Sequence, residues 1–228
     1  MALTTFAENG QLVFGLNSSY NSTELQDMVS NATTQGGATL YSQSLEHLHS
    51  LIVSPGPLGY RGGRVAVVIV TDGRNQEQLS LTSAAAARLR SVATVLFVGV
   101  GDLVAPELPE TLASSQNLIF TANESSVLPS LAAVVAQKIE CGLITYPTTT
   151  STATTTTTTQ STTSTTQGQP ATELPTSAKS VSCDGYQARQ RIIFLLDASS
   201  SVPGNSWRSV IEYVKTQADN TGVRLAMP

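Results

Sequence analysis

The sequence is poor in charged residues, which make up 12% of its 228 residues, where about a quarter is usual in soluble domains. The formal net charge is −4, and Lys and Arg form no cluster. Nucleic-acid binding requires a basic patch that neutralises phosphates, so we expect no nucleic-acid partner. The hydrophobic fraction of 40% is nevertheless large enough to build a core.

Long apolar runs are also missing, and none reaches the roughly 18–20 residues that cross a bilayer. Met1–Glu8 has neither the basic nor the apolar region of a signal peptide. Other features indicate a secreted protein, because residues 148–166 are nearly all Thr and Ser, as in O-glycosylated stalks. Sequons for N-glycosylation begin at Asn17, Asn21, Asn31 and Asn123. We therefore expect an extracellular location, secreted or in the ectodomain of a surface protein, and a natural start before Met1.

Cysteine is scarce, with Cys141 and Cys183 on either side of the Thr-rich tract. In a secreted chain two cysteines suggest a single bridge, although each could pair with a cysteine in sequence beyond this chain. In either arrangement we expect both cysteines to have a structural role and not to be reactive.

Hydrophobic patterning divides residues 1–141 into alternating strands and helices. The runs Val65–Val70 and Thr94–Val100 lack polar alternation, which predicts strands that are covered on both faces. The other predicted elements are strands at 3–6, 11–16 and 118–120 and helices at 23–30, 40–53, 78–91, 106–114 and 128–139. Two-sided strands that alternate with amphipathic helices predict an α/β fold, a doubly wound and mostly parallel sheet with helices on both faces.

After a linker, a second segment repeats the same kind of pattern. Its first element is the apolar strand 192–196, followed by a helix over about 206–219 and the start of another strand at 223–227. The first strand ends in Asp197-Ala198-Ser199-Ser200-Ser201, a D-x-S-x-S pattern that places one carboxylate and two hydroxyls in a tight loop. Oxygen ligands of this kind suit a hard cation such as Mg²⁺, and open α/β sheets place their sites where strands end.

At these residues the sequence resembles the von Willebrand factor type A domain family, whose metal-ion-dependent adhesion site opens with this pattern. The segment Gln35–Leu45, which contains Thr39 after a Gly-Gly pair, resembles the family's second part. The segment Val68–Arg74, in which Asp72 ends a buried strand, resembles its third. The resemblance implies that Asp197, Ser199, Ser201, Thr39 and Asp72 hold Mg²⁺, or another divalent cation such as Mn²⁺. It further implies that an acidic residue of an extracellular protein, from the matrix or a cell surface, fills an open position on that cation.

The order of these parts departs from the family, in which the D-x-S-x-S strand comes first. The main interpretation is a window across two tandem domains. Residues 1–141 would be a domain without its first strand and helix, 142–189 a Thr/Ser-rich mucin-like linker, and 190–228 the start of a second such domain.

The alternative is that the C-terminal segment supplies the missing strand, either within the chain or in self-association by strand swapping. The linker is long enough for either, and Cys141 and Cys183 would then lie near each other, since family members often join their domain ends by such a bridge. Against this alternative, Met1–Phe6 and Val223–Met227 both resemble the same second strand.

The predicted function is therefore adhesion or matrix binding through a cation-bridged carboxylate. The competing hypothesis is a structural spacer on a glycosylated stalk with no working metal site. The sequence contains no G-x-S-x-G, H-E-x-x-H or G-x-x-x-x-G-K-[ST] motif, so we do not expect an enzyme.

Overall fold

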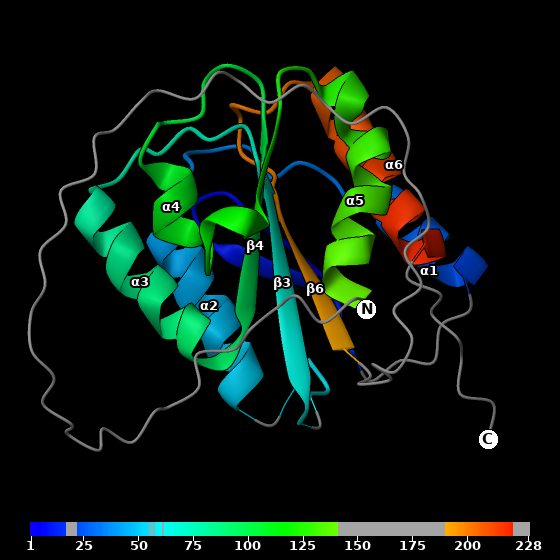
Figure 1. Ribbon diagram of the computed structural model, residues 1–228, viewed down its shortest axis with the longest axis horizontal. Helices are drawn as coiled ribbons and strands as arrows, with labels where there is room; N and C mark the ends of the chain where they lie inside the picture. Colours follow the sequence, from blue (N-terminus) through cyan, green and yellow to red (C-terminus); the bar gives the residue numbers. More distant parts are fainter. Residues whose placement is uncertain (17–21, 55, 57, 61, 141–189, 221–228) are drawn as a thin grey trace, which may run out of the picture.

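The computed structural model describes residues 1–16, 22–54, 56, 58–60, 62–140 and 190–220. Within these residues, six strands form one sheet in the order β2-β1-β6-β3-β4-β5 (Figure 1). The strands are β1 (Ala2–Phe6), β2 (Gly10–Phe14), β3 (Arg64–Thr71), β4 (Thr94–Val100), β5 (Ile119–Ala122) and β6 (Gln190–Asp197). Only the β1–β2 pair is antiparallel among the strand pairs of this sheet, which confirms the mostly parallel α/β prediction.

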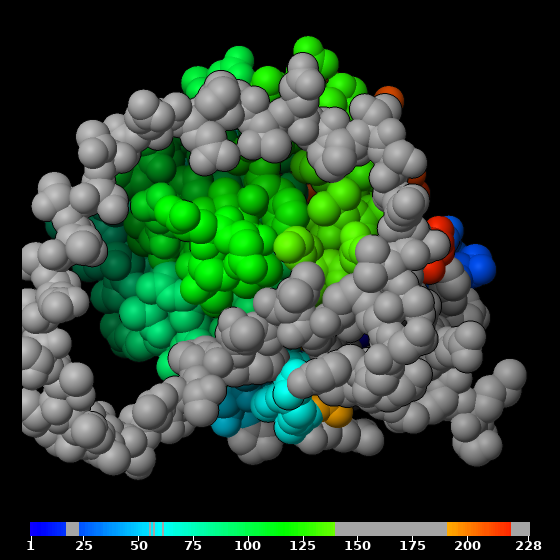
Figure 2. All heavy atoms as spheres, viewed as in Figure 1, coloured from blue at the N-terminus to red at the C-terminus, as the bar shows by residue number. Residues whose placement is uncertain are grey.

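Helices cover both faces of the sheet (Figure 1). One layer consists of α2 (Tyr41–Val53), α3 (Leu79–Val92) and α4 (Leu108–Leu112). The other consists of α1 (Ser22–Ser30), α5 (Leu128–Glu140) and α6 (Gly204–Asn220). The predicted bounds of the helices agree with these to within a residue or two. Viewed with all atoms as spheres, the middle of the face in Figure 2 is filled by the green part of the chain, to which α4 and α5 belong.

The core lies in two layers because alternate residues of each central strand point to opposite faces. In β3, Val68 and Val70 belong to the core beneath α5 and α6, whereas Val67 and Ile69 belong to the core beneath α2 and α3. All four are at most 1% exposed. The absence of polar alternation in this strand thus reflects burial on both sides, as predicted.

β6 is a central strand although it comes last among the described strands. It pairs in parallel with β1, from Ala2↔Ile193 to Phe6↔Asp197, and with β3 on its other side. The structure therefore joins the two segments in one sheet, which is the arrangement described by the single-site alternative. The division into tandem domains stays a prediction, since the strand expected at 223–227 lies outside the described residues.

Candidate metal centre

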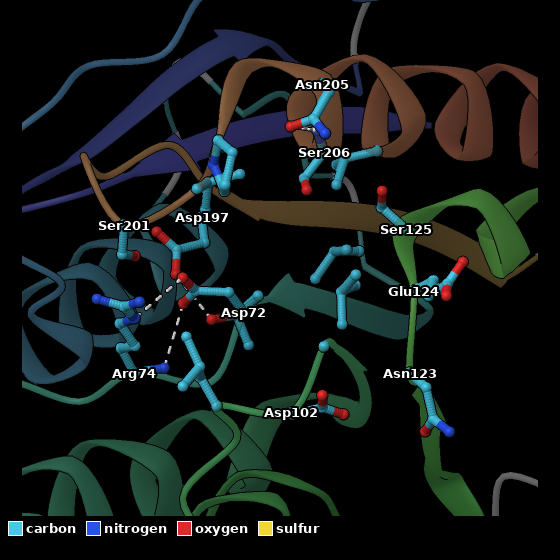
Figure 3. Close-up of a pocket in the computed structure, with 18 of the residues that line it drawn as sticks. Asp72, Arg74, Asp102, Asn123, Glu124, Ser125, Asp197, Ser201, Asn205 and Ser206 are labelled. Atoms are coloured by element: carbon cyan, nitrogen blue, oxygen red, sulfur yellow. Dashed lines mark hydrogen bonds and ion pairs between the residues drawn. The ribbon is translucent and has the colours of Figure 1, made fainter.

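The site lies where β3 and β6 end side by side. The two strands are parallel, with Val70 opposite Leu196, so the residues that follow them meet at one edge of the sheet. Asp197 is the last residue of β6, and Asp72 directly follows β3. Figure 3 shows their carboxyl groups pointing toward one another. This is the edge at which open α/β sheets bind ligands.

Asp197 is held in a buried position and is only 2% exposed. Thr71 Oγ1 donates a hydrogen bond to Asp197 Oδ2 over 2.7 Å, and the Ser199 N–H donates to Oδ1 over 3.1 Å. Burial raises the pKa of Asp197 from 3.8 to about 6; the hydrogen bonds from Ser199 and Thr71 oppose this, and the negative charge of Asp72 adds to it. A bound cation would offset both the desolvation and the repulsion.

Nearby positive charge is limited. Arg74 Nε lies 3.7 Å from Asp72 Oδ2, but this guanidinium side chain is 48% exposed whereas Asp72 is 12% exposed. An ion pair with one partner so open to water contributes little. Among the described residues, no other ion pair to either carboxylate accompanies this one. Two carboxylates that face one another in this setting fit a divalent cation between them.

A buried chain of hydroxyls supports Asp197 from behind. Tyr41 is wholly buried, and its hydroxyl lies 2.6 Å from Thr71 Oγ1. Because the Thr71 proton is donated to Asp197, the Tyr41 hydroxyl must donate to Thr71. Burial, followed by the charge of Asp197, raises the pKa of Tyr41, so its proton stays in place. Thr71 Oγ1 also accepts from the Gly73 N–H over 3.0 Å, which fixes the start of the loop that carries Asp72.

Three further hydroxyls meet beside the carboxylates. Thr39 Oγ1 donates to Ser199 Oγ over 2.8 Å, Ser199 Oγ lies 2.8 Å from Ser201 Oγ, and Thr39 Oγ1 lies 3.4 Å from Ser201 Oγ. The structure therefore brings together all the residues predicted as ligands. In the described residues no group of three or more His, Cys, Asp and Glu side chains could hold a metal, so a metal centre here would need these hydroxyl oxygens.

Backbone contacts join the Thr39 loop to the loop that follows β6. The N–H groups of Gln35 and Gly36 donate to the Ala198 carbonyl over 2.8 and 3.0 Å. In return, the Ser200 N–H and hydroxyl donate to the Gly37 carbonyl over 3.1 and 2.8 Å. Gly36 and Gly37 have φ of 72° and 80°, a backbone conformation that favours glycine. The Gly-Gly pair thus lets the loop turn back against β6.

A second clamp fixes Thr39 to the loop that follows Asp72. The Thr39 N–H donates to Gln76 Oε1 over 2.9 Å, and the Gln76 N–H donates to the Thr39 carbonyl over 3.2 Å. Next to it, the Glu77 carboxylate accepts from the Ser42 N–H over 2.6 Å, from the Ser42 hydroxyl over 2.5 Å and from the Thr82 hydroxyl over 2.8 Å. These contacts connect the starts of α2 and α3 with the Asp72 loop.

A cavity of about 480 Å³ adjoins the carboxylates. Its lining includes the apolar residues Val70, Val100, Val202 and Val210. Figure 3 shows Asn205 and Ser206 of α6 at the top of the view, and Ser125, Glu124 and Asn123 along its right side. Space for part of a partner molecule therefore lies beside the cluster of oxygens.

Comparison with known proteins identifies the fold. The family model of the von Willebrand factor type A domain matches residues 1–134. The chain belongs to this family. No curated protein matches the sequence. The match ends before β6, so the strand that completes the sheet of this von Willebrand factor type A (VWA) domain lies outside the part that the family model covers.

Solved structures of proximal thread matrix protein 1 from the mussel byssus have a similar fold. The form with a zinc-occupied MIDAS (metal-ion-dependent adhesion site) motif matches with a TM-score of 0.55 and 21% identity over 61% of this chain. A second crystal form gives the same values, with 38% of its own length covered. The VWA chain thus spans little more than a third of these structures. Domains of this family generally bind protein ligands and are typically non-enzymatic, which supports an adhesion or matrix-binding module in general terms.

Several residues of the site were not predicted from the sequence. Thr71 and Tyr41 support Asp197, and Gln76 holds Thr39. Thr71 and Tyr41 lie within the segments that resemble the family but were not predicted to act in the site, and Gln76 lies outside those segments. Thr71 had one local signal, its position immediately before Asp72 at the end of a buried strand.

The predicted modification sites are only partly described. Asn31 and Asn123 are exposed, and Asn123 lies at the wall of the cavity. Asn17, Asn21, Cys141 and Cys183 lie outside the described residues, so the predicted glycans and bridge stay predictions. In the described part of the chain, none of the helices has the length and apolar character needed to span a membrane.

Proposed function

We propose that this VWA domain is an extracellular adhesion module that binds an acidic residue of a protein ligand through a divalent cation. The observation that carries the proposal is the meeting of two facing carboxylates and three hydroxyls at one edge of the sheet. Asp197, Ser199 and Ser201 come from the β6 loop, and Thr39 and Asp72 come from the facing loops. The zinc in the MIDAS motif of the mussel protein supports a divalent cation in this fold.

Each part of the site has a separate task in this proposal. The cation, which we take to be Mg²⁺ or Mn²⁺, supplies positive charge to which a ligand carboxylate binds in a charge-assisted contact. The hydroxyls contribute neutral oxygens, so the site retains electrophilic character toward the ligand. Tyr41 and Thr71 hold Asp197 in place, and the adjoining cavity receives the part of the ligand next to its carboxylate.

The extracellular location belongs to the same proposal. Its support is the four sequons and the Thr/Ser-rich segment 148–166, together with the exposure of Asn31 and Asn123 in the structure. Deglycosylation of the chain secreted from a eukaryotic host, followed by measurement of its mass, tests this part.

The function is tested by cation binding and then by binding to matrix proteins. Isothermal titration with Mn²⁺ should show one site in the chain and none in Asp72→Ala. Asp102→Ala is a matched control, since Asp102 lines the cavity but lies outside the proposed ligands. Retention on beads coated with collagen or fibronectin, as probes, should be lost in EDTA and in Asp72→Ala. Absence of Mn²⁺ binding in the parent chain would leave the spacer hypothesis in its place.

A further inference from the structure

A positively charged side chain, Arg74, lies at the edge of the candidate site. It belongs to the loop that follows β3 and lines the cavity beside the carboxylates. Among the described residues that line this cavity, Arg74 is the only arginine or lysine. Figure 3 shows its guanidinium next to Asp72 and below Ser201 in the view. Positive charge so close to a proposed cation site opposes cation binding by repulsion, so the position of Arg74 needs another explanation.

The hydrogen bond and the ion pair described for Arg74 both involve Asp72. The Arg74 backbone N–H donates to Asp72 Oδ1 over 3.2 Å. The side-chain Nε lies 3.7 Å from Asp72 Oδ2, which is beyond the range of a hydrogen bond. The loop therefore fixes the backbone of Arg74 against Asp72, whereas the guanidinium forms only a weak ion pair with that carboxylate.

The guanidinium keeps its hydrogen-bonding capacity for a ligand. An arginine side chain carries five N–H donors in a planar fork, which matches the two oxygens of a carboxylate. In the part of the chain that the structure describes, none of these donors makes a hydrogen bond, and the side chain is 48% exposed. A carboxylate that arrives from outside can thus bind this group without displacing a protein acceptor.

The charges of the site favour an anionic ligand once Arg74 is included. Asp72 and Asp197 together balance the charge of a divalent cation, and the hydroxyl oxygens are neutral. Arg74 then adds one positive charge, which a single ligand carboxylate neutralises. The other charged residues of the cavity lining are Asp102 and Glu124. Both are exposed, so water weakens their repulsion toward such a ligand.

We propose that Arg74 binds the carboxylate of the partner's acidic residue together with the cation, so that each positive group holds one of its oxygens. This inference rests on the proposed function and assigns a further residue to its ligand contact. The weak pair with Asp72 is exchanged for a charge-assisted contact with the ligand. A carboxylate held by two positive groups is selected over a neutral amide, so the partner offers Asp or Glu and not Asn or Gln.

Substitution of Arg74 tests the proposal with N-acetylglutamate amide, a probe that has one side-chain carboxylate. The chain is loaded with Mn²⁺, and displacement of Mn²⁺-bound water by the probe is followed by water proton relaxation. Arg74→Gln should weaken probe binding about tenfold or more, because a charge-assisted hydrogen bond is lost. Arg74→Lys should lose less, because it keeps the charge without the planar fork. The neutral analogue N-acetylglutamine amide should displace little water in any of these proteins.

Two measurements without the probe separate a ligand contact from a structural role. In titration calorimetry Arg74→Gln should bind Mn²⁺ at least as tightly as wild type, because a like charge is removed. Its melting temperature in EDTA should change by no more than about 2 °C, because an exposed ion pair contributes little. Arg208→Gln is the matched control, since Arg208 is an exposed arginine of α6 that does not line the cavity. It should change none of the three measurements.

The outcomes distinguish this inference from the proposed function. Equal probe affinity in wild type and Arg74→Gln would overturn the inference and leave the proposed function intact. Loss of Mn²⁺ binding in Arg74→Gln would also overturn it, because Arg74 would then act only by holding Asp72. If wild type binds no Mn²⁺, or if its bound Mn²⁺ does not take the probe, the proposed function fails and this inference fails with it.

Discussion

Asp197→Asn should make the cation-free domain more stable at neutral pH. The buried carboxyl has a pKa of about 6 in the folded chain, against 3.8 as its ordinary value. Between these values the folded state binds more protons than the unfolded state, so the stability contributed by this group falls as pH rises. This difference in pKa corresponds to about 3 kcal/mol in the free energy of unfolding, which is lost between about pH 4 and pH 7.

Asparagine removes this titration while it keeps the shape of the side chain. The asparagine NH₂ group can donate to Thr71 Oγ1 if the Thr71 hydroxyl turns to donate to the Tyr41 hydroxyl, which lies 2.6 Å away. In EDTA the stability of the variant relative to wild type should therefore increase by about 3 kcal/mol from pH 4 to pH 7.5. For a domain of this size that corresponds to roughly 6–12 °C in the melting temperature.

The assay is thermal melting of both proteins in EDTA and in Mg²⁺ across this pH range. All other titrating groups are shared, so the difference between the two proteins isolates Asp197. Mg²⁺ should raise the melting temperature of wild type more at pH 7.5 than at pH 5, because it binds the ionised carboxylate, and should have little effect on the variant. A difference between the two proteins in EDTA that stays constant with pH would refute this reasoning.

Two other substitutions have distinct expected outcomes. Gln76→Ala should weaken Mn²⁺ binding about tenfold in titration calorimetry, because it removes the side-chain oxygen that accepts from the Thr39 N–H and leaves only the backbone hydrogen bond of the clamp. Gln78→Ala is the control, and equal losses in both would contradict the role of the clamp. Gly73→Ala should lower the free energy of unfolding in urea by about 2–4 kcal/mol, because φ is +79° and the added Cβ meets the backbone of a neighbouring loop. Gly101→Ala, at φ +90° with open space around it, should cost only about 1–2 kcal/mol, and a similar loss at both positions would rule out the steric part.

The sequence by itself indicated the types of the elements and the five residues that we propose as cation ligands. Runs such as Val65–Val70 show burial on both faces because side chains alternate along a strand, and this information is local. The oxygen-rich motif around Asp197 and the Thr-Asp-Gly at the end of β3 could also be recognised in the sequence, since each lies in a few consecutive residues at the end of an apolar strand. The bounds of the elements followed for the same reason.

Only the tertiary structure decided which segments come together. The insertion of β6 between β1 and β3 joins residues more than 100 positions apart. The hydrophobic pattern of an apolar strand does not specify which strands pair with its two edges. The roles of Tyr41, Thr71 and Gln76 depend on the same event, because each acts through a hydrogen bond to a residue on another loop or strand. Local periodicity specifies the face that a residue occupies, whereas docking of distant segments is selected by the packing and hydrogen bonds of the whole sheet.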